Sequence, residues 1–167
     1  IITAGGLGVH RWPLDVHATP SGTSCAVGAS ELVSEARDVR TASLSPREDR
    51  LAIVGGSGID VLDLREPAPS VHIDHPRSGG AAWIPDGSWI ASHGRWVPVS
   101  VFDAVSGRAI RVLERTNAGA AFSPDGSMLL TCTPAALEVW GVDEWTLVRR
   151  IERDEAAGRG RIAVVPS

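Results

Sequence analysis

The chain contains no lysine, so all 16 of its basic residues are arginines. Without lysine, Schiff-base chemistry and lysine-containing phosphate loops are excluded for this sequence. No apolar run approaches the roughly 20 residues that a membrane-spanning helix needs, so we expect no membrane insertion. Cationic residues are also too few for a general phosphate-binding surface. The net charge of −4 therefore argues against a nucleic-acid partner.

Cysteine is scarce as well. Cys25 and Cys132 are far apart in the sequence and lack the spacing of metal ligands. We interpret both as small apolar residues in a reducing compartment and predict a cytoplasmic location. The chain opens with "IITAGG", directly in a strand-like segment and without an initiator methionine, which favours a fragment of a larger protein. An upstream export signal would instead favour the periplasm.

The most prominent feature of the sequence is a repeated motif. "AAWIPDGSWIASHG" begins at Ala81 and "AAFSPDGSMLLTCT" begins at Ala120. Aligned on their prolines, Pro46, Pro85 and Pro124, three copies follow one another at intervals of 39 residues. Proline ends a strand ladder, aspartate tolerates turn geometry, and glycine supplies the positive φ of a tight hairpin. Each copy thus predicts two strands joined by a tight turn.

Each repeat holds four short strand-like segments, and helical patterning is nearly absent. "SELVSEAR" is the one stretch with a helical pattern, and its position in the repeat predicts an outer strand. We expect the stretch 15–23 to be irregular. Large apolar residues recur two positions before and five positions after each proline, and we predict that they face the core: Leu44, Trp83, Phe122, Leu51, Ile90 and Leu129. Four short strands in about forty residues are typical of a β-propeller blade.

The ends of the third segments, "VHRWPL", "DVLDL", "SVFDA" and "LEVWGV", resemble the tryptophan–aspartate ending of WD repeats. Asp63 and Asp103 match the aspartate, whereas Pro13 and Gly141 replace it, and no glycine–histidine dipeptide precedes a first strand. The match is degenerate. It implies an all-β propeller of four-stranded antiparallel blades, but it does not imply the buried hydrogen-bond tetrad of the family. Periplasmic propellers related to the translocation protein TolB also carry "PDG" hairpins and are the closest rival.

The repeat predicts one propeller segment over 1–167 with about four blades' worth of strands. Two arrangements stay open: a closed four-bladed unit, in which the last strand completes the first blade, or a partial propeller cut from a larger ring. The predicted parts are a blade lacking its first strand at 1–37, complete blades at 38–76, 77–116 and 117–154, and a further first strand at 160–167.

Candidate chemistry is sparse. His72, Asp74 and His75 are the best metal-ligand candidates, because two imidazoles and a carboxylate suit a transition metal. They fall on an outermost strand, where we expect them to be solvated, and we predict no metal centre and no cofactor. The glycine-rich stretch 55–60 precedes no helix, so it does not indicate a nucleotide site. No catalytic set converges, and we predict that the chain is not an enzyme.

The resemblance implies a noncatalytic scaffold for protein–protein contacts. The alternatives are a TolB-like accessory propeller and a ligand-binding or enzymatic propeller whose site lies partly in other blades. Arginines recur in the connections between blades and near Trp96, and we predict a binding patch on one end of the blades. Its members are Arg37, Arg40, Arg77, Arg95, Trp96, Arg115 and Arg159.

Such a patch would favour a protein or peptide partner that is acidic or phosphorylated. The alternative is that these arginines are scattered and merely keep the surface soluble. Trp96 also has two interpretations. It either folds back over the adjacent blade, which we favour, or it presents an interface residue beside Arg95, since tryptophan and arginine are enriched in interface hot spots.

Overall fold

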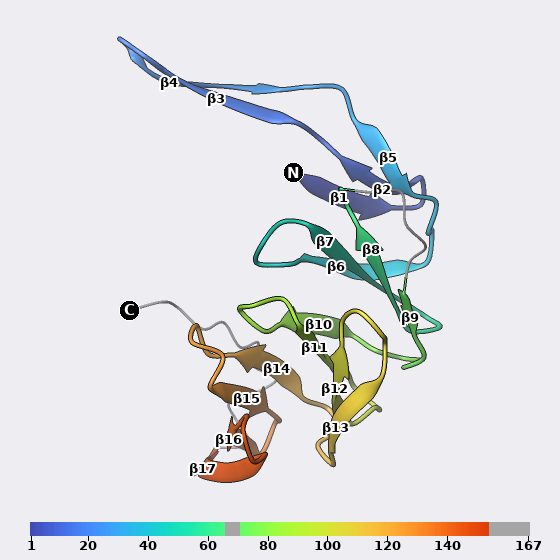
Figure 1. Ribbon diagram of the computed structural model, residues 1–167, viewed down its shortest axis with the longest axis vertical. Helices are drawn as coiled ribbons and strands as arrows, with labels where there is room; N and C mark the ends of the chain where they lie inside the picture. Colours follow the sequence, from blue (N-terminus) through green and yellow to red (C-terminus); the bar gives the residue numbers. More distant parts are fainter. Residues whose placement is uncertain (66–70, 154–167) are drawn as a thin grey trace. The chain divides into compact units, whose positions relative to one another are not determined.

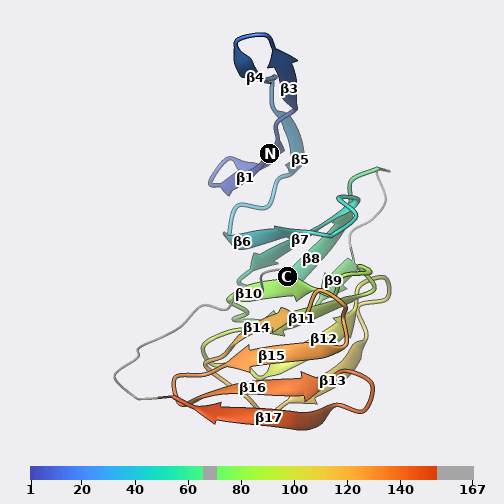
Figure 2. The same ribbon diagram turned by 90° about the vertical axis from the view of Figure 1, so that its left-hand side faces the viewer.

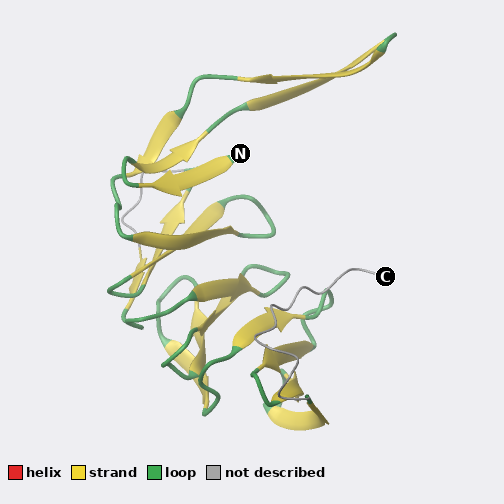
Figure 3. Ribbon diagram, turned by 180° about the vertical axis from the view of Figure 1, so that it is seen from behind, coloured by secondary structure: helices red, strands yellow, loops and turns green. Residues whose placement is uncertain are grey.

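The computed structural model describes residues 1–65 and 71–153, which form strands and loops without a helix (Figure 3). Within these residues, therefore, no helix has the length and apolar character that a membrane crossing requires. The chain divides into two compact units, residues 1–39 and 40–167, and each is described by itself. The predicted all-β class is confirmed.

The first unit contains a three-stranded antiparallel sheet of β1 (Ile2–Gly5), β2 (Gly8–Arg11) and β5 (Glu31–Ser34), in that order. Gly8 begins β2 with φ +107, and a Cβ there would lie 2.6 Å from the carbonyl oxygen of Ser34. Only glycine fits this position without displacing β5. The prediction of an outer strand for "SELVSEAR" is confirmed, because β5 lies at the edge of the sheet.

A long hairpin of β3 (Leu14–Thr19) and β4 (Gly22–Val27) is inserted between β2 and β5. The expectation of an irregular stretch at 15–23 is therefore wrong. The strands pair in continuous register, with Val16 opposite Cys25, and their side chains are exposed on both faces. The sequence of β3, "LDVHAT", alternates apolar and polar residues as a half-buried strand does, although neither face of the hairpin is buried here.

The second unit is built of three four-stranded antiparallel sheets, one after another in Figures 1 and 2. In each sheet the strands lie side by side in chain order. The first sheet has β6 (Val39–Leu44), β7 (Arg50–Gly55), β8 (Ile59–Asp63) and β9 (Val71–Ile73). The second has β10 (Gly80–Trp83), β11 (Trp89–His93), β12 (Val99–Asp103) and β13 (Ala109–Leu113). The third has β14 (Gly119–Phe122), β15 (Met128–Cys132), β16 (Ala136–Gly141) and β17 (Thr146–Glu152).

The repeated "PDG" motif makes the tight turns that join the first two strands of the second and third sheets. Gly87 and Gly126 adopt φ values of +75 and +74, as predicted. In both turns the aspartate accepts hydrogen bonds from the serine two residues later; Asp86 Oδ1, for example, lies 2.8 Å from the Ser88 nitrogen. In the first sheet, Glu48 occupies the same turn position with φ 57. An L-residue there carries the steric cost of the left-handed region.

Two apolar clusters form the core of the second unit, and they lie between successive sheets. Leu51, Trp83, Ile90, Phe122 and Leu129 are buried, which confirms five of the six predicted core positions. The sixth prediction is wrong, because Leu44 is 39% exposed. Its counterparts lie between two sheets of this unit, whereas Leu44 lies on the first strand of the first sheet.

A hydrogen bond adds to this apolar packing. The Trp83 Nε1–H donates to the backbone carbonyl of Ser43 at 2.9 Å, so the first strands of neighbouring sheets are tied together. This bond fixes β10 beside β6, and the hollow described next lies along the same strands.

Candidate functional site

The second unit contains a hollow of ≈ 670 Å³ along its first strands. Its walls come from β6, β10 and β14 and from the turns that follow β11 and β15, over residues 40–43, 79–81, 93–95, 117–120 and 132–134. Glycine and alanine make up much of the lining, so the space is left open by small side chains. Among the described residues that line it, none is an aspartate or glutamate, and the charged ones are Arg40 and Arg95.

Arg40 reaches from β6 toward the loop that precedes β10. Its guanidinium Nη1 donates to the backbone carbonyl of Ser78 at 3.1 Å. One of the five N–H donors of the guanidinium is thus used to hold the side chain in place. The positive charge is not neutralised by this bond, because its acceptor is a carbonyl.

Arg95 lies in the turn after β11, and its position is tightly determined. The preceding Gly94 is buried, and a Cβ there would lie 2.9 Å from both the Gly79 nitrogen and the Arg77 carbonyl oxygen. The Arg95 carbonyl accepts a hydrogen bond from the Asn117 N–H at 3.1 Å, which links this turn to the loop that precedes β14. The guanidinium lies over the ring of Trp96, 5.0 Å from its centroid.

Trp96 does not fold back over the adjacent sheet. Its side chain is 64% exposed, so the interpretation favoured from the sequence is wrong. The flanking residues explain this orientation: Gly94 and Val97 are both buried, and they turn the residues between them outward. The remaining interpretation, an exposed aromatic residue beside Arg95, agrees with this geometry.

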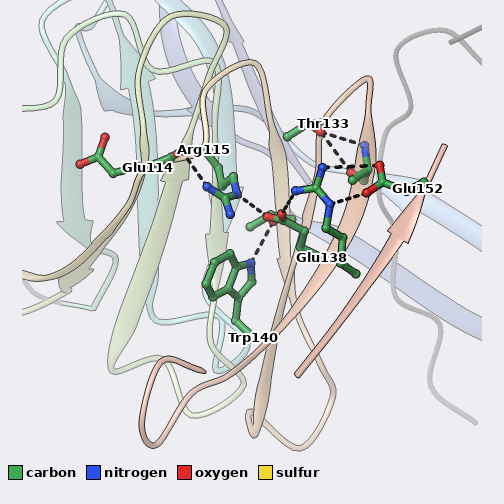
Figure 4. A network of polar contacts seen from close by, with 9 residues as sticks. Glu114, Arg115, Thr133, Glu138, Trp140 and Glu152 are labelled. Atoms are coloured by element: carbon green, nitrogen blue, oxygen red, sulfur yellow. Dashed lines mark hydrogen bonds and ion pairs between the residues drawn. The ribbon is translucent and has the colours of Figure 1, made fainter. Parts of the chain in front are cut away.

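Arg115 and Arg77 take part in local structure instead of lining the hollow. Arg115 Nε donates to Glu138 Oε2 at 2.5 Å, and its guanidinium lies over Trp140, 5.3 Å from the ring centroid (Figure 4). Arg150 Nη1 donates to the other oxygen of Glu138 at 2.7 Å. Because the Glu138 side chain is 1% exposed, these two arginines compensate a buried charge.

Three residues of the predicted patch remain. Arg77 is in the left-handed region with φ 66, and its N–H donates to the Gly56 carbonyl at 3.3 Å. Arg37 belongs to the first unit, and Arg159 lies outside the described residues. Of the predicted patch, the structure therefore brings Arg40 and Arg95 to one hollow and places Trp96 next to Arg95.

His93 also lines the hollow, but it adds no charge at neutral pH. Burial lowers the pKa of its imidazole, and the hydrogen bond to the Ala118 backbone opposes this effect only in part. A Cβ at Gly80 would lie 2.6 Å from the His93 ring, so a larger residue there would force the imidazole to shift. The charge of the hollow at neutral pH therefore comes from its two arginines.

The metal-ligand candidates have other partners. His72 Nδ1 lies 2.7 Å from Asp60 Oδ1 at the surface, in agreement with the solvated interpretation. That interpretation is wrong for His75, whose Nδ1 lies 2.8 Å from Ser78 Oγ and 2.9 Å from Ser92 Oγ. Burial lowers the pKa of His75, although the Asp74 charge opposes this. Across residues 1–65 and 71–153, no group of three histidine, cysteine or acidic side chains is placed to hold a metal.

Two polar clusters, at least partly buried, were not predicted from the sequence. One is the His75–Ser78–Ser92 set, whose histidine ring also meets Phe102 edge-on at 5.4 Å. The other centres on Glu138, where Trp140 Nε1 donates to Thr131 Oγ1 at 3.1 Å.

The pairing of threonine with tryptophan occurs a second time. Trp12 Nε1 donates to Thr3 Oγ1 at 2.8 Å, across the same nine-residue separation as Trp140 and Thr131. This recurrence was a signal available in the sequence.

No family model matches the chain, and no curated protein matches it. Solved structures do match. Hydrazine synthase of Kuenenia stuttgartiensis has a TM-score of 0.59 and 21% identity over 70% of this chain and 36% of its own. The WD40 repeats of RRP9 match with a TM-score of 0.59 and 18% identity, over 68% of this chain and 38% of that one.

The structure of U3-55K gives a TM-score of 0.57 and 18% identity, over 68% of this chain and 39% of that one. The chain spans less than two fifths of each of these three structures. At these identities the likeness concerns the fold. The fold is that of WD40-like propellers, and the three sheets of the second unit resemble propeller blades.

Proposed function

We propose that this chain is a noncatalytic propeller segment that binds a protein partner through the hollow between its first strands, taking up an acidic or phosphorylated stretch of that partner. The observation that carries the proposal is the positive charge of the hollow, which no acidic residue balances among the described residues that line it. Arg40 and Arg95 are both exposed, and the described lining contains no carboxylate that would pair with them.

The geometry of the two arginines supports this role. Arg40 is held by a carbonyl and Arg95 by an aromatic ring, so neither contact pairs the guanidinium with a negatively charged group. Carboxylate and phosphate groups bind guanidinium through charge-assisted, often bidentate hydrogen bonds. A volume of ≈ 670 Å³ also lies in the range of pockets that enclose small ligands, so it has room for an extended side chain.

A cytoplasmic location is part of the proposal. Cys25 and Cys132 are both free thiols, and free thiols suit a reducing compartment. The catalytic alternative has no comparable support, because the likeness to hydrazine synthase at 21% identity concerns the fold.

The test is a titration of fluorescently labelled ten-residue peptides followed by anisotropy. One peptide carries four glutamates, a second carries two phosphoserines, and a third of neutral composition is the reference. We expect the anionic peptides to bind at least tenfold more tightly than the neutral one, which corresponds to about 1.4 kcal/mol. Raising the salt concentration should reduce this difference.

Charge reversal identifies the surface. Arg40→Glu combined with Arg95→Glu should abolish the preference for anionic peptides. Arg111→Glu is the matched control, because Arg111 is an exposed arginine on β13, an outer strand that does not line the hollow. Equal loss in the control, or retention of the preference in the double variant, would refute the proposal.

A further inference from the structure

Trp96 is exposed on a short loop whose flanks are fixed. Gly94 and Val97 are buried on either side of the exposed pair Arg95 and Trp96. A Cβ at Gly94 would also lie 2.9 Å from the Val97 side chain, so the loop is packed closely against itself. The indole is therefore presented to solvent by a constrained backbone and loses little conformational entropy on binding.

The indole lies directly next to the charged hollow. The Arg95 guanidinium is 5.0 Å from the centroid of the Trp96 ring, and Arg95 itself lines the hollow. A cation and an exposed apolar surface thus occur within the reach of one ligand. Contact with Arg95 leaves 64% of the tryptophan side chain open to solvent, which is enough area for a second apolar contact.

We propose that the partner binds in two parts: an anionic side chain enters the hollow at Arg40 and Arg95, and an apolar or aromatic side chain one or two residues away packs on Trp96. This inference rests on the proposed function and adds the composition of the recognised segment. The spacing is chosen because the Arg95 guanidinium and the Trp96 ring centroid are 5.0 Å apart, and an extended chain advances roughly 3.4 Å per residue.

Two physical effects favour the second contact. Burying apolar surface of an exposed tryptophan against another apolar side chain removes both from water. Desolvation of the indole also strengthens its attraction for the Arg95 guanidinium, since cation–π contacts gain when water is excluded. The two parts of the ligand are therefore expected to reinforce each other across Arg95.

The experiment uses the full chain and four labelled peptides. Peptide one carries two phosphoserines alone, and peptide two adds a leucine two residues after the second phosphoserine. Peptide three has the leucine and no phosphoserine, and peptide four moves the leucine six residues away. Each is titrated against the unchanged protein, Trp96→Ala, Trp96→Phe and a control, Val105→Ala. Val105 is also an exposed apolar residue, in the turn between β12 and β13, which does not line the hollow.

We expect the nearby leucine to tighten binding about fivefold. Trp96→Ala should remove this gain, Trp96→Phe should retain most of it, and Val105→Ala should leave it unchanged. Moving the leucine away should remove the gain in the unchanged protein. The readout is the coupling between the leucine and Trp96, which a purely structural role of the indole would not produce.

Two results overturn the inference, and they differ in what they imply for the hollow. If peptide one binds and depends on Arg95, but Trp96→Ala weakens peptides one and two by the same factor, Trp96 acts only by orienting Arg95. If peptide one does not bind the unchanged protein, the proposed function fails, and the two-part recognition fails with it.

Discussion

The turn at Glu48 allows a quantitative test of the repeat. Glu48, Gly87 and Gly126 occupy the same position of three successive turns and all have positive φ, at 57, 75 and 74. A non-glycine residue pays about 1–2 kcal/mol in the left-handed region. Glycine has more conformational freedom in the unfolded chain, and this lowers the free energy of unfolding by about 0.4–1 kcal/mol. We expect Glu48→Gly to stabilise the protein by roughly 0.5–1 kcal/mol.

Two further variants separate backbone strain from side-chain effects. Glu48→Ala removes the exposed carboxylate and keeps the strained φ, so its free energy of unfolding should stay close to that of the unchanged protein. Gly87→Ala introduces the same strain where glycine is native. No heavy atom lies within 4 Å of a Cβ built at Gly87, so its expected loss of about 1 kcal/mol comes from the backbone alone.

The assay is urea denaturation followed by circular dichroism, together with hydrogen exchange of the β6–β7 amides. If Glu48→Gly is less stable than Glu48→Ala, the steric argument for this turn is refuted. The same conclusion follows if Gly87→Ala is neutral, since no other contact would mask its cost.

Three other predictions concern the third sheet of the second unit. Thr131→Val should cost about 1–3 kcal/mol in urea denaturation, because it leaves the buried Trp140 Nε1–H without an acceptor. Arg115→Met should lower the free energy of unfolding by about 2–3 kcal/mol, because the buried Glu138 then keeps only one of its two arginine partners. Since the pair is buried, the loss should persist at high salt, and a loss that disappears in 1 M salt would contradict this.

Bonds from Ser123 and Ser127 lower the pKa of Asp125 to about 2, so its contribution to stability is complete above about pH 4 and is lost as the pH falls toward 2. The melting temperature of Asp125→Asn should fall less than that of the unchanged protein between these pH values, and an equal fall would show that other groups control the acid transition.

Much of the fold could be predicted because the determinants are local. The turn glycines and the apolar residues around Pro85 and Pro124 act within a single hairpin, and their meaning does not depend on distant contacts. Because the motif recurs, the hairpin predicted in one copy could also be expected in the next copy. Leu44 shows the limit of this reasoning: its counterparts Trp83 and Phe122 are buried against the preceding sheet of the second unit, and the first sheet of that unit has none.

The β3–β4 hairpin was missed for a related reason. The apolar–polar alternation of "LDVHAT" indicates a strand, but β3 and β4 pair only with each other and lie outside the 39-residue repeat, so the repeat did not predict them. His75 illustrates the opposite case. Its neighbours in sequence are exposed, but Ser92 comes from another strand and accommodates it in a partly buried cluster. A single sequence cannot indicate that partner.

One register position explains why Arg115 does not contribute to the hollow. Ser92 pairs with Ser100 in the second sheet, and Thr131 pairs with Glu138 at the corresponding place in the third. A buried carboxylate at that place requires cationic partners, and it draws Arg115 away from the surface available to a ligand. The serine at the corresponding place of the second sheet carries no charge and imposes no such demand. A binding patch in a repeat protein therefore has to be deduced after each buried charge has been assigned its partners.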